Sequence, residues 1–205
     1  MSISIPGRVV VFDYGEVLSQ TPNETDRAEI IGIAGVDAEP FWASYWSHRD
    51  ELDRGSLSVT EYWRRIESEV GANWSASELQ RLWAADFRSW ISVEPGAIEL
   101  LAELYSGGTR LALLSNAGFD FGGALRASPM GQYFERVFVS AELDLLKPDP
   151  AIYRHVATEL GITPAQFVFV DNKSVNTEAA AALGVTVHHF VGVDELARFL
   201  RSLGE

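Results

Sequence analysis

The sequence predicts a doubly wound α/β fold, with a parallel sheet of about five strands and an inserted α-helical segment. Short apolar runs rich in β-branched residues alternate with helix-period segments along most of the chain, as in right-handed βαβ units. Residues 20–91 break this alternation, because they contain only helix-period segments. The chain has 205 residues, of which 47% are hydrophobic, so it can bury a core without disulfides or structural metals.

The apolar runs are expected to form strands that are buried on both faces of the sheet. These strands are expected at residues 8–13, 111–114, 137–139, 167–170 and 185–190. Amphipathic segments between them predict helices at residues 95–105, 150–160, 177–183 and 193–203. Pro95 and Pro150 lie at helix starts, and Gly161 and Gly184 directly follow helix ends, which are the positions that these residue types prefer.

The segment at residues 20–91 is expected to be a helix bundle inserted after the first strand. Its helices are expected at residues 26–34, 39–47, 60–70 and 75–90. All six tryptophans fall in this segment. We expect most of them to form the bundle core and one or two to line a pocket that faces the sheet. The chain then divides into a core of residues 1–19 and 92–205 and a helical insert of residues 20–91.

Composition excludes several classes of protein. A formal net charge of −13 argues against a nucleic-acid partner, because phosphate backbones are bound by Lys and Arg. The chain has no cysteine, which excludes disulfides, thiolate catalysis and sulfur-ligated zinc. No apolar run approaches the ~20 residues that span a bilayer, and residues 1–6 lack the pattern of a signal peptide. We therefore expect a cytoplasmic protein without a membrane partner, and the tryptophan-rich insert is compatible with a homodimer contact.

Polar side chains follow four of the apolar runs. The first run delivers Asp13, the second Ser115 with Asn116, the third leads to Lys147, and the fourth delivers Asp171 with Asn172. The carboxyl ends of parallel strands meet at one edge of a sheet, which is where ligands bind in this fold class. Two carboxylates, a hydroxyl and a lysine are therefore expected to converge there.

This set of groups suits phosphoryl transfer. A carboxylate can attack phosphorus and form an aspartyl-phosphate. A hydroxyl and a lysine can hold the non-bridging oxygens, and the lysine also reduces the repulsion between nucleophile and phosphate. Two carboxylates around one site favour Mg²⁺, a hard cation that prefers oxygen ligands.

The order and spacing of these motifs resemble the haloacid dehalogenase superfamily over essentially the whole chain. Four segments resemble the four motifs of that family, in order. The first is Asp13 in Val-Phe-Asp-Tyr-Gly-Glu-Val-Leu, and the second is Ser115-Asn116. The third is Lys147-Pro148-Asp149-Pro150, and the fourth is Asp171-Asn172. Asn176 and Glu178 match the usual continuation of the fourth motif. The helical insert at residues 20–91 lies where the family has its small helical cap, and Leu52–Ser58 resembles a cap turn.

The resemblance implies a role for each matching residue. The catalytic residues would be Asp13 as nucleophile, Ser115 and Lys147. The ligands of a Mg²⁺ cofactor would be Asp13, the backbone carbonyl of Gly15, Asp171 and Asn172. The residues that bind the substrate would be Tyr14, Ser115, Asn116, Lys147 and, from the cap, Arg54.

Two positions depart from the family pattern. Phosphatases of the family usually have a second Asp, a general acid and base, where this chain has Gly15. Glycine loses that proton transfer, which is typically worth about 10²–10⁴-fold, and the side chain of Glu16 is expected to point elsewhere. Asn172 replaces a second metal-binding acid, so we expect weak Mg²⁺ binding. Lys173 is expected to be solvated.

The expected function is Mg²⁺-dependent hydrolysis of a small phosphorylated metabolite through an aspartyl-phosphate at Asp13. One alternative is a metal-independent 2-haloacid dehalogenase, in which the Asp attacks carbon. Asp171 argues against it, because a metal-free site does not need an extra carboxylate. The other alternative, suggested by Gly15 and Asn172, is a degenerate member that binds a ligand without turnover.

Overall fold

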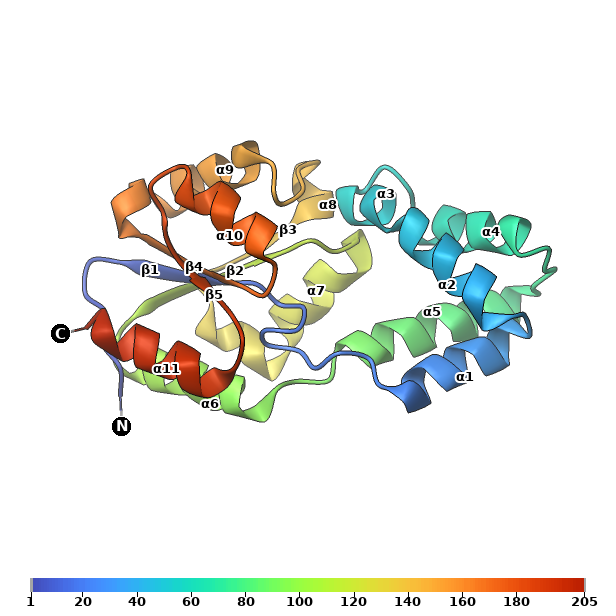
Figure 1. Ribbon diagram of the computed structural model, residues 1–205, viewed down its shortest axis with the longest axis horizontal. Coiled ribbons are helices and arrows are strands. Elements are labelled where there is room, and N and C mark those ends of the chain that lie inside the picture. The colour runs from blue at the N-terminus through green and yellow to red at the C-terminus, as the bar shows by residue number, and fades with distance from the viewer. Residues whose placement is uncertain (1, 205) are drawn as a thin grey trace.

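A five-stranded sheet lies at the centre of the computed structural model, which describes residues 2–204 (Figure 1). Its strands are β1 (Val9–Phe12), β2 (Arg110–Ser115), β3 (Arg136–Val139), β4 (Phe167–Asp171) and β5 (Thr186–His189). They lie in the order β3-β2-β1-β4-β5, and each neighbouring pair is parallel. Every strand begins and ends within one residue of its predicted bounds. The predicted α/β fold is confirmed.

Helices cover both faces of this sheet (Figure 1). One face packs against α6 (Pro95–Ser106), α7 (Phe119–Ala127) and α11 (Val193–Ser202), and the other against α9 (Pro150–Leu160) and α10 (Ser174–Ala181). The side chains of β1 alternate between the two cores. Val10 and Phe12 lie in the first, whereas Val9 and Val11 lie in the second, as the two-residue period of a strand requires. This alternation fixes which side chains leave the sheet on which face at its carboxyl edge.

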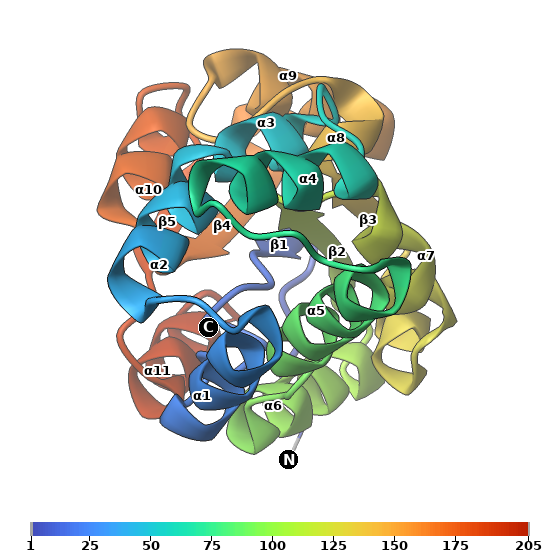
Figure 2. The same cartoon turned by 90° about the vertical axis from the view of Figure 1, so that its right-hand side faces the viewer.

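The remaining helices form a group beyond the carboxyl ends of the strands (Figures 1 and 2). They are α1 (Glu24–Ala34), α2 (Ala38–Ser47), α3 (Arg49–Arg54), α4 (Val59–Glu69) and α5 (Ala76–Trp90). Their shared core is rich in aromatic residues, among them Phe41, Trp63 and Trp74. A single antiparallel bridge between Ser19 and Val93 ties the segment that enters this group to the one that leaves it.

Several short elements were not predicted. They are α3, α7, α8 (Ser140–Leu143) and the 3₁₀ helices η1 (Pro129–Tyr133) and η2 (Pro164–Gln166). Helix α10 begins at Ser174, three residues before the predicted start. The sequence pattern misses this first turn because its buried residues, Asn176 and Thr177, are polar and do not continue the periodic apolar pattern of the helix. None of the helices within residues 2–204 is both long and apolar enough to cross a bilayer.

Candidate active site

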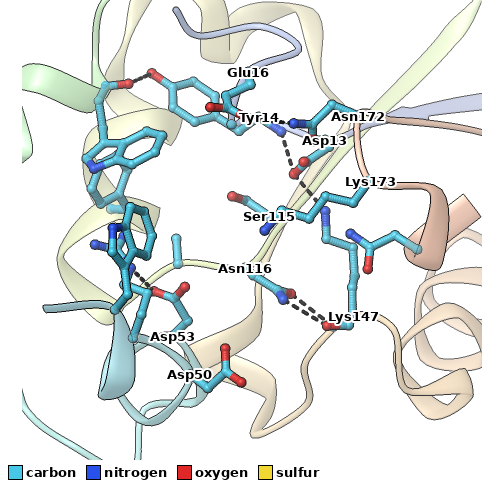
Figure 3. A pocket seen from close by; sticks show the side chains of 17 residues that line it. Asp13, Tyr14, Glu16, Asp50, Asp53, Ser115, Asn116, Lys147, Asn172 and Lys173 are labelled. Carbon is cyan, nitrogen blue, oxygen red and sulfur yellow. Dashed lines mark hydrogen bonds and ion pairs between the residues drawn. The ribbon is translucent and has the colours of Figure 1, made fainter. Parts of the chain in front are cut away.

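A cavity of about 300 Å³ lies at the carboxyl ends of β1, β2 and β4, between the sheet and the α1–α5 group (Figure 3). The sheet side contributes Asp13, Ser115, Lys147 and Asn172. The helical side contributes Trp46, Arg49, Asp50, Asp53 and Trp90. Of the six polar residues expected to converge here, five line the cavity and Asp171 does not. Trp46 and Trp90 also line it, in keeping with the expectation of one or two tryptophans.

The carboxylate of Asp13, which follows β1, is held through one of its oxygens. The ammonium Nζ of Lys147 lies 2.7 Å from Oδ1, and the backbone N–H of Tyr14 donates to the same oxygen at 2.8 Å. Among the residues described, these contacts leave Oδ2 for a ligand in the cavity. Burial raises the pKa of Asp13 to about 6, against the opposing effect of the Lys147 ammonium. A single oxygen thus carries the positioning, and the other remains for chemistry.

Lys147 stands between two carboxylates. Its Nζ also lies 2.7 Å from Oδ2 of Asp171 and donates to the carbonyl of Leu114 at 3.1 Å. Burial on its own would lower the pKa of Lys147, but Asp13 and Asp171 outweigh it and the pKa is raised. Lys147 is therefore a fixed positive charge beside the Asp13 carboxylate.

Asp171 does not reach the cavity, and this corrects its expected place among the metal ligands. The residue is fully buried. Besides Lys147, its oxygens accept hydrogen bonds from Nδ2 of Asn176 at 3.0 and 3.1 Å and from the backbone N–H of Lys173 at 2.8 Å. Each of its oxygens accepts from two donors, and Asp171 is not among the residues that line the cavity, so the structure does not support it as a ligand. Its charge holds Lys147 in place.

Ser115 is the last residue of β2, Asn116 follows it, and both line the cavity. Asn116 has its amide fully engaged with the backbone of Lys147. Its Nδ2 donates to the Lys147 carbonyl at 3.0 Å, and its Oδ1 accepts from the Lys147 N–H at 2.9 Å. Asn116, expected to bind substrate, thus fixes the loop that carries Lys147, and Ser115 is the polar side chain of β2 that faces the cavity.

The loop after β1 and the end of β4 bring oxygen donors to the cavity beside Asp13. Gly15, Glu16 and Asn172 line it here. The Oδ1 atom of Asn172 is buried and has no hydrogen-bond partner within the described part of the chain. An unpaired buried polar atom costs about 1–3 kcal/mol, and a hard cation would satisfy it. The donors from Asp13, Gly15 and Asn172 therefore fit Mg²⁺, although no group of three or more His, Cys, Asp or Glu residues within 2–204 is arranged for a metal.

Tyr14 and Arg54, the other two expected substrate-binding residues, lie differently. Tyr14 lines the cavity, and its hydroxyl donates to the backbone carbonyl of Trp90 at 2.9 Å, so it ties the loop after β1 to the end of α5. Arg54 is not among the residues that line the cavity. Its Nη1 donates to the carbonyl of Asp144 at 3.3 Å. The structure corrects the expectation for Arg54, which joins α3 to the loop after α8.

Arg49, and not the expected Arg54, lines the cavity from the helical side. Its Nε donates to Oδ1 of Asp53 at 3.0 Å, and its Nη1 donates to the hydroxyl of Tyr45 at 2.8 Å. Its guanidinium lies 5.8 Å from the ring centre of Trp90. Burial raises the pKa of Asp53 to about 6, while Arg49 opposes that rise. The spacing of Arg49 and Asp53, four residues apart on one helical face, is the signal that was available.

Close contacts join the α1–α5 group to the sheet around the cavity. The hydroxyl of Ser140, a fully buried residue, donates to the carbonyl of Asp53 and accepts from the N–H of Ala117 at 2.9 Å. Gly55 ends α3 with a φ of 83°. A Cβ there would lie 2.7 Å from the ring of Phe119 and 2.8 Å from the carbonyl of Ala141, so only glycine permits this approach.

Comparisons with known proteins agree with this fold. A sequence model of the haloacid dehalogenase-like hydrolases matches residues 30–190. The (S)-2-haloacid dehalogenase 4A of Burkholderia cepacia is 32% identical over 196 residues, covering 86% of this chain and 80% of that protein. The D-ribitol-5-phosphate phosphatase of Bacteroides thetaiotaomicron is 24% identical over 184 residues, covering 85% and 87%.

A similar fold occurs in the crystal structure of a haloacid dehalogenase family enzyme from Bacteroides thetaiotaomicron in complex with magnesium and inorganic phosphate. That structure has a TM-score of 0.69 and 21% identity, and the match covers 88% of this chain and 92% of that one. Since the family model matches most of the chain and relatives reach 32% identity, the protein belongs to the haloacid dehalogenase-like hydrolases.

Proposed function

We propose that this hydrolase is a Mg²⁺-dependent phosphatase of a small phosphorylated metabolite, with Asp13 as nucleophile. The observation that carries the proposal is the buried, unpartnered Oδ1 of Asn172 beside the Asp13 carboxylate. A phosphatase that holds a cation has a use for this oxygen, whereas a metal-free dehalogenase leaves it unsatisfied. The cavity of about 300 Å³ lies at the small end of ligand sites, in keeping with a small substrate.

The reaction proceeds in two displacements at phosphorus. One oxygen of Asp13 forms a bond to phosphorus as the bond from phosphorus to the ester oxygen breaks, and the leaving alkoxide takes up a proton. Water then attacks the aspartyl-phosphate, which releases inorganic phosphate and restores the carboxylate. Lys147, fixed 2.7 Å from Oδ1 of Asp13, balances charge on the nucleophile and the phosphoryl oxygens. The Ser115 hydroxyl is available for a hydrogen bond to one of those oxygens.

Asp13, the carbonyl of Gly15 and Oδ1 of Asn172 would hold the cation. When bound, Mg²⁺ supplies positive charge that offsets the repulsion between the carboxylate and the phosphate. The remaining positions in its shell would be taken by water and substrate oxygens, as is usual for this ion. Gly15 offers no side chain for proton transfer, so the leaving group departs with less assistance than in family phosphatases that have Asp there.

Residues 20–91 act in this proposal as a cap that selects the substrate. Trp46 and Trp90 present aromatic surface to the cavity, and Arg49 presents a guanidinium whose position is fixed by Asp53 and Tyr45. The part of the substrate that leaves phosphorus would contact this wall, because the nucleophile lies on the opposite, sheet side (Figure 3).

The deciding experiment measures phosphate release from a panel of phosphorylated metabolites and chloride release from 2-chloroacids, each with Mg²⁺ and with EDTA. Asp13→Asn serves as the blank, since it removes the nucleophile and keeps the size of the side chain. Phosphate release that EDTA abolishes supports the phosphatase. Phosphate release that is unchanged in EDTA contradicts the proposed metal, and the absence of both products supports a member that binds without turnover.

One observation favours 2-haloacid dehalogenase as the second candidate. Asp171 is bound to Lys147 and Asn176 and faces no cation site, so its presence no longer argues against a metal-free reaction. Named (S)-2-haloacid dehalogenases are 32% and 30% identical to this chain. In that reaction, Asp13 would attack the halogen-bearing carbon, expel halide and form an ester that water hydrolyses. Chloride release in EDTA would support this candidate.

A further inference from the structure

The metal ligands named in the proposed function carry little negative charge. Position 172 is an amide, which carries no charge, and Asp171 has both oxygens engaged by donors. The charge of Asp13 is shared with the Lys147 ammonium at 2.7 Å. A hard divalent cation is usually bound through one or two carboxylates, so a second carboxylate that faces the cavity would strengthen the site.

Glu16 is the acidic residue whose position meets this need. It follows Gly15 directly and lines the cavity. Its backbone is left-handed, with a φ of 58°, which is uncommon for a residue other than glycine. Its N–H donates to Oγ of Ser19 at 3.2 Å. The loop therefore turns sharply at Glu16. Because of this turn, Glu16 lines the cavity, whereas its side chain is expected from the sequence to point elsewhere.

The Glu16 carboxylate is held on both oxygens. Nδ2 of Asn172 donates to Oε2 at 2.7 Å, and Oγ1 of Thr21 donates to Oε1 at 3.1 Å. The same Asn172 amide thus binds Glu16 through its nitrogen, while its oxygen is buried and has no hydrogen-bond partner among residues 2–204. Figure 3 shows Glu16 and Asn172 close together beside Asp13. One amide links the carboxylate to the oxygen that fits a cation.

We propose that Glu16 supplies the second carboxylate of the divalent-cation site, in place of the acid that position 172 lacks. The inference rests on the proposed metal dependence. The carboxylate acts on the cation directly or through one of the waters that Mg²⁺ retains. Asn172 then has two functions, as an uncharged ligand through Oδ1 and as the group that holds Glu16 through Nδ2.

Direct Mg²⁺ titration by calorimetry tests this without reference to activity. Glu16→Gln removes the charge but keeps an oxygen that can accept from Asn172. Asp50→Asn is the matched control, because Asp50 is an exposed carboxylate on the helical wall of the same cavity. We expect Glu16→Gln to raise the dissociation constant for Mg²⁺ by about tenfold or more. Asp50→Asn should raise it by less than about twofold, because the interaction between charges falls with distance and with solvent screening. The rise in Tm caused by Mg²⁺ should shrink in parallel.

Adding Asn172→Asp to Glu16→Gln should restore tight Mg²⁺ binding, because it returns a carboxylate to the site. Unchanged binding in Glu16→Gln, or equal weakening in Glu16→Gln and Asp50→Asn, would overturn the assignment of Glu16 while leaving the phosphatase proposal standing. A wild-type protein that does not bind Mg²⁺ also overturns it. Phosphate release in EDTA then decides separately whether the proposed reaction survives without the metal.

Discussion

Replacing Lys147 with Met perturbs the charge arrangement at the centre of the site. Nζ of Lys147 lies 2.7 Å from both Asp13 and Asp171, and these three side chains are 1%, 9% and 0% exposed. Met has a similar length but leaves two buried carboxylates without a cation. Removal of one partner from a buried ion pair costs about 3–5 kcal/mol. We expect Lys147→Met to lower the free energy of unfolding at pH 7 by an amount in that range.

A second substitution tests whether charge is the cause. With Asp171→Asn added to Lys147→Met, one buried carboxylate remains instead of two, and the amide can still bond to Asn176 and to the N–H of Lys173. We expect the double variant to recover part of the lost stability, with a coupling energy within the roughly 0.5–3 kcal/mol seen for residues in one ion-pair network. Loss of packing alone would give no such recovery.

The loss should also depend on pH, and its sign is fixed by linkage. Burial already raises the pKa of Asp13 to about 6 in the wild type, and without Lys147 this pKa rises further above the unfolded value near 3.9. The folded variant then binds more protons than the unfolded chain between these values, so its stability falls as pH rises through that window. The penalty is full once the Asp13 carboxyl is ionised in the folded variant and decreases as pH falls towards about 4.

Urea unfolding of the wild type, both single variants and the double variant, at pH 7 and pH 5, measures these effects. Activity is followed in parallel, and both variants without Lys147 should be inactive, because Asp13 has lost its cation. The reasoning would be refuted if Lys147→Met stayed within about 1 kcal/mol of the wild type at pH 7, the value of an exposed ion pair. It would also be refuted if the double variant were as unstable as Lys147→Met.

Three further predictions concern separate parts of the molecule. Gly15→Asp should raise turnover of alkyl phosphates more than that of aryl phosphates, by up to about 10²–10⁴-fold. Within residues 2–204, no atom beyond the chain neighbours lies within 4 Å of the added Cβ. Equal effects on both esters in steady-state assays would exclude proton transfer as the cause. Ser140→Ala should lower the free energy of unfolding in urea by about 1–3 kcal/mol, because the N–H of Ala117 and the carbonyl of Asp53 lose their shared partner; an unchanged midpoint would contradict this. Burial lowers the pKa of His188, so on acidification its imidazole is protonated in the unfolded chain before it is protonated in the folded protein. Stability should therefore fall as pH drops below about 6.5. His188→Phe should reduce this dependence of Tm on pH in thermal unfolding, and an identical dependence would rule out His188 as its source.

The sequence predicts the strand-end residues well and the cap residues poorly, for a geometric reason. Any residue directly after a parallel strand lies at the carboxyl edge of the sheet, so Asp13 and Ser115 were found without knowledge of side-chain directions. In the cap, the relevant helix was not predicted, and the choice between arginines depends on helical phase. Arg49 and Arg54 are five residues apart, so they point about 140° apart around α3. Only Arg49 faces the cavity.

The position of Asp171 follows from the pairing of β1 with β4 and from the alternation of side chains between the two faces of the sheet. Phe12 pairs with Val170, so Asp13 is level with Asp171 and both continue the face formed by Val9, Val11, Phe167 and Phe169. Two carboxylates on one face of neighbouring strands repel each other unless a cation lies between them, and Lys147 is that cation. Asn172, which follows the last residue of β4, is the residue of the fourth motif that lines the cavity, beside Gly15 and Glu16. The two departures from the family pattern and the left-handed glutamate therefore share one side of the nucleophile. In the proposed metal site, a change at any one of them should alter the metal affinity contributed by the others, so we expect the loop after β1 and the end of β4 to act together.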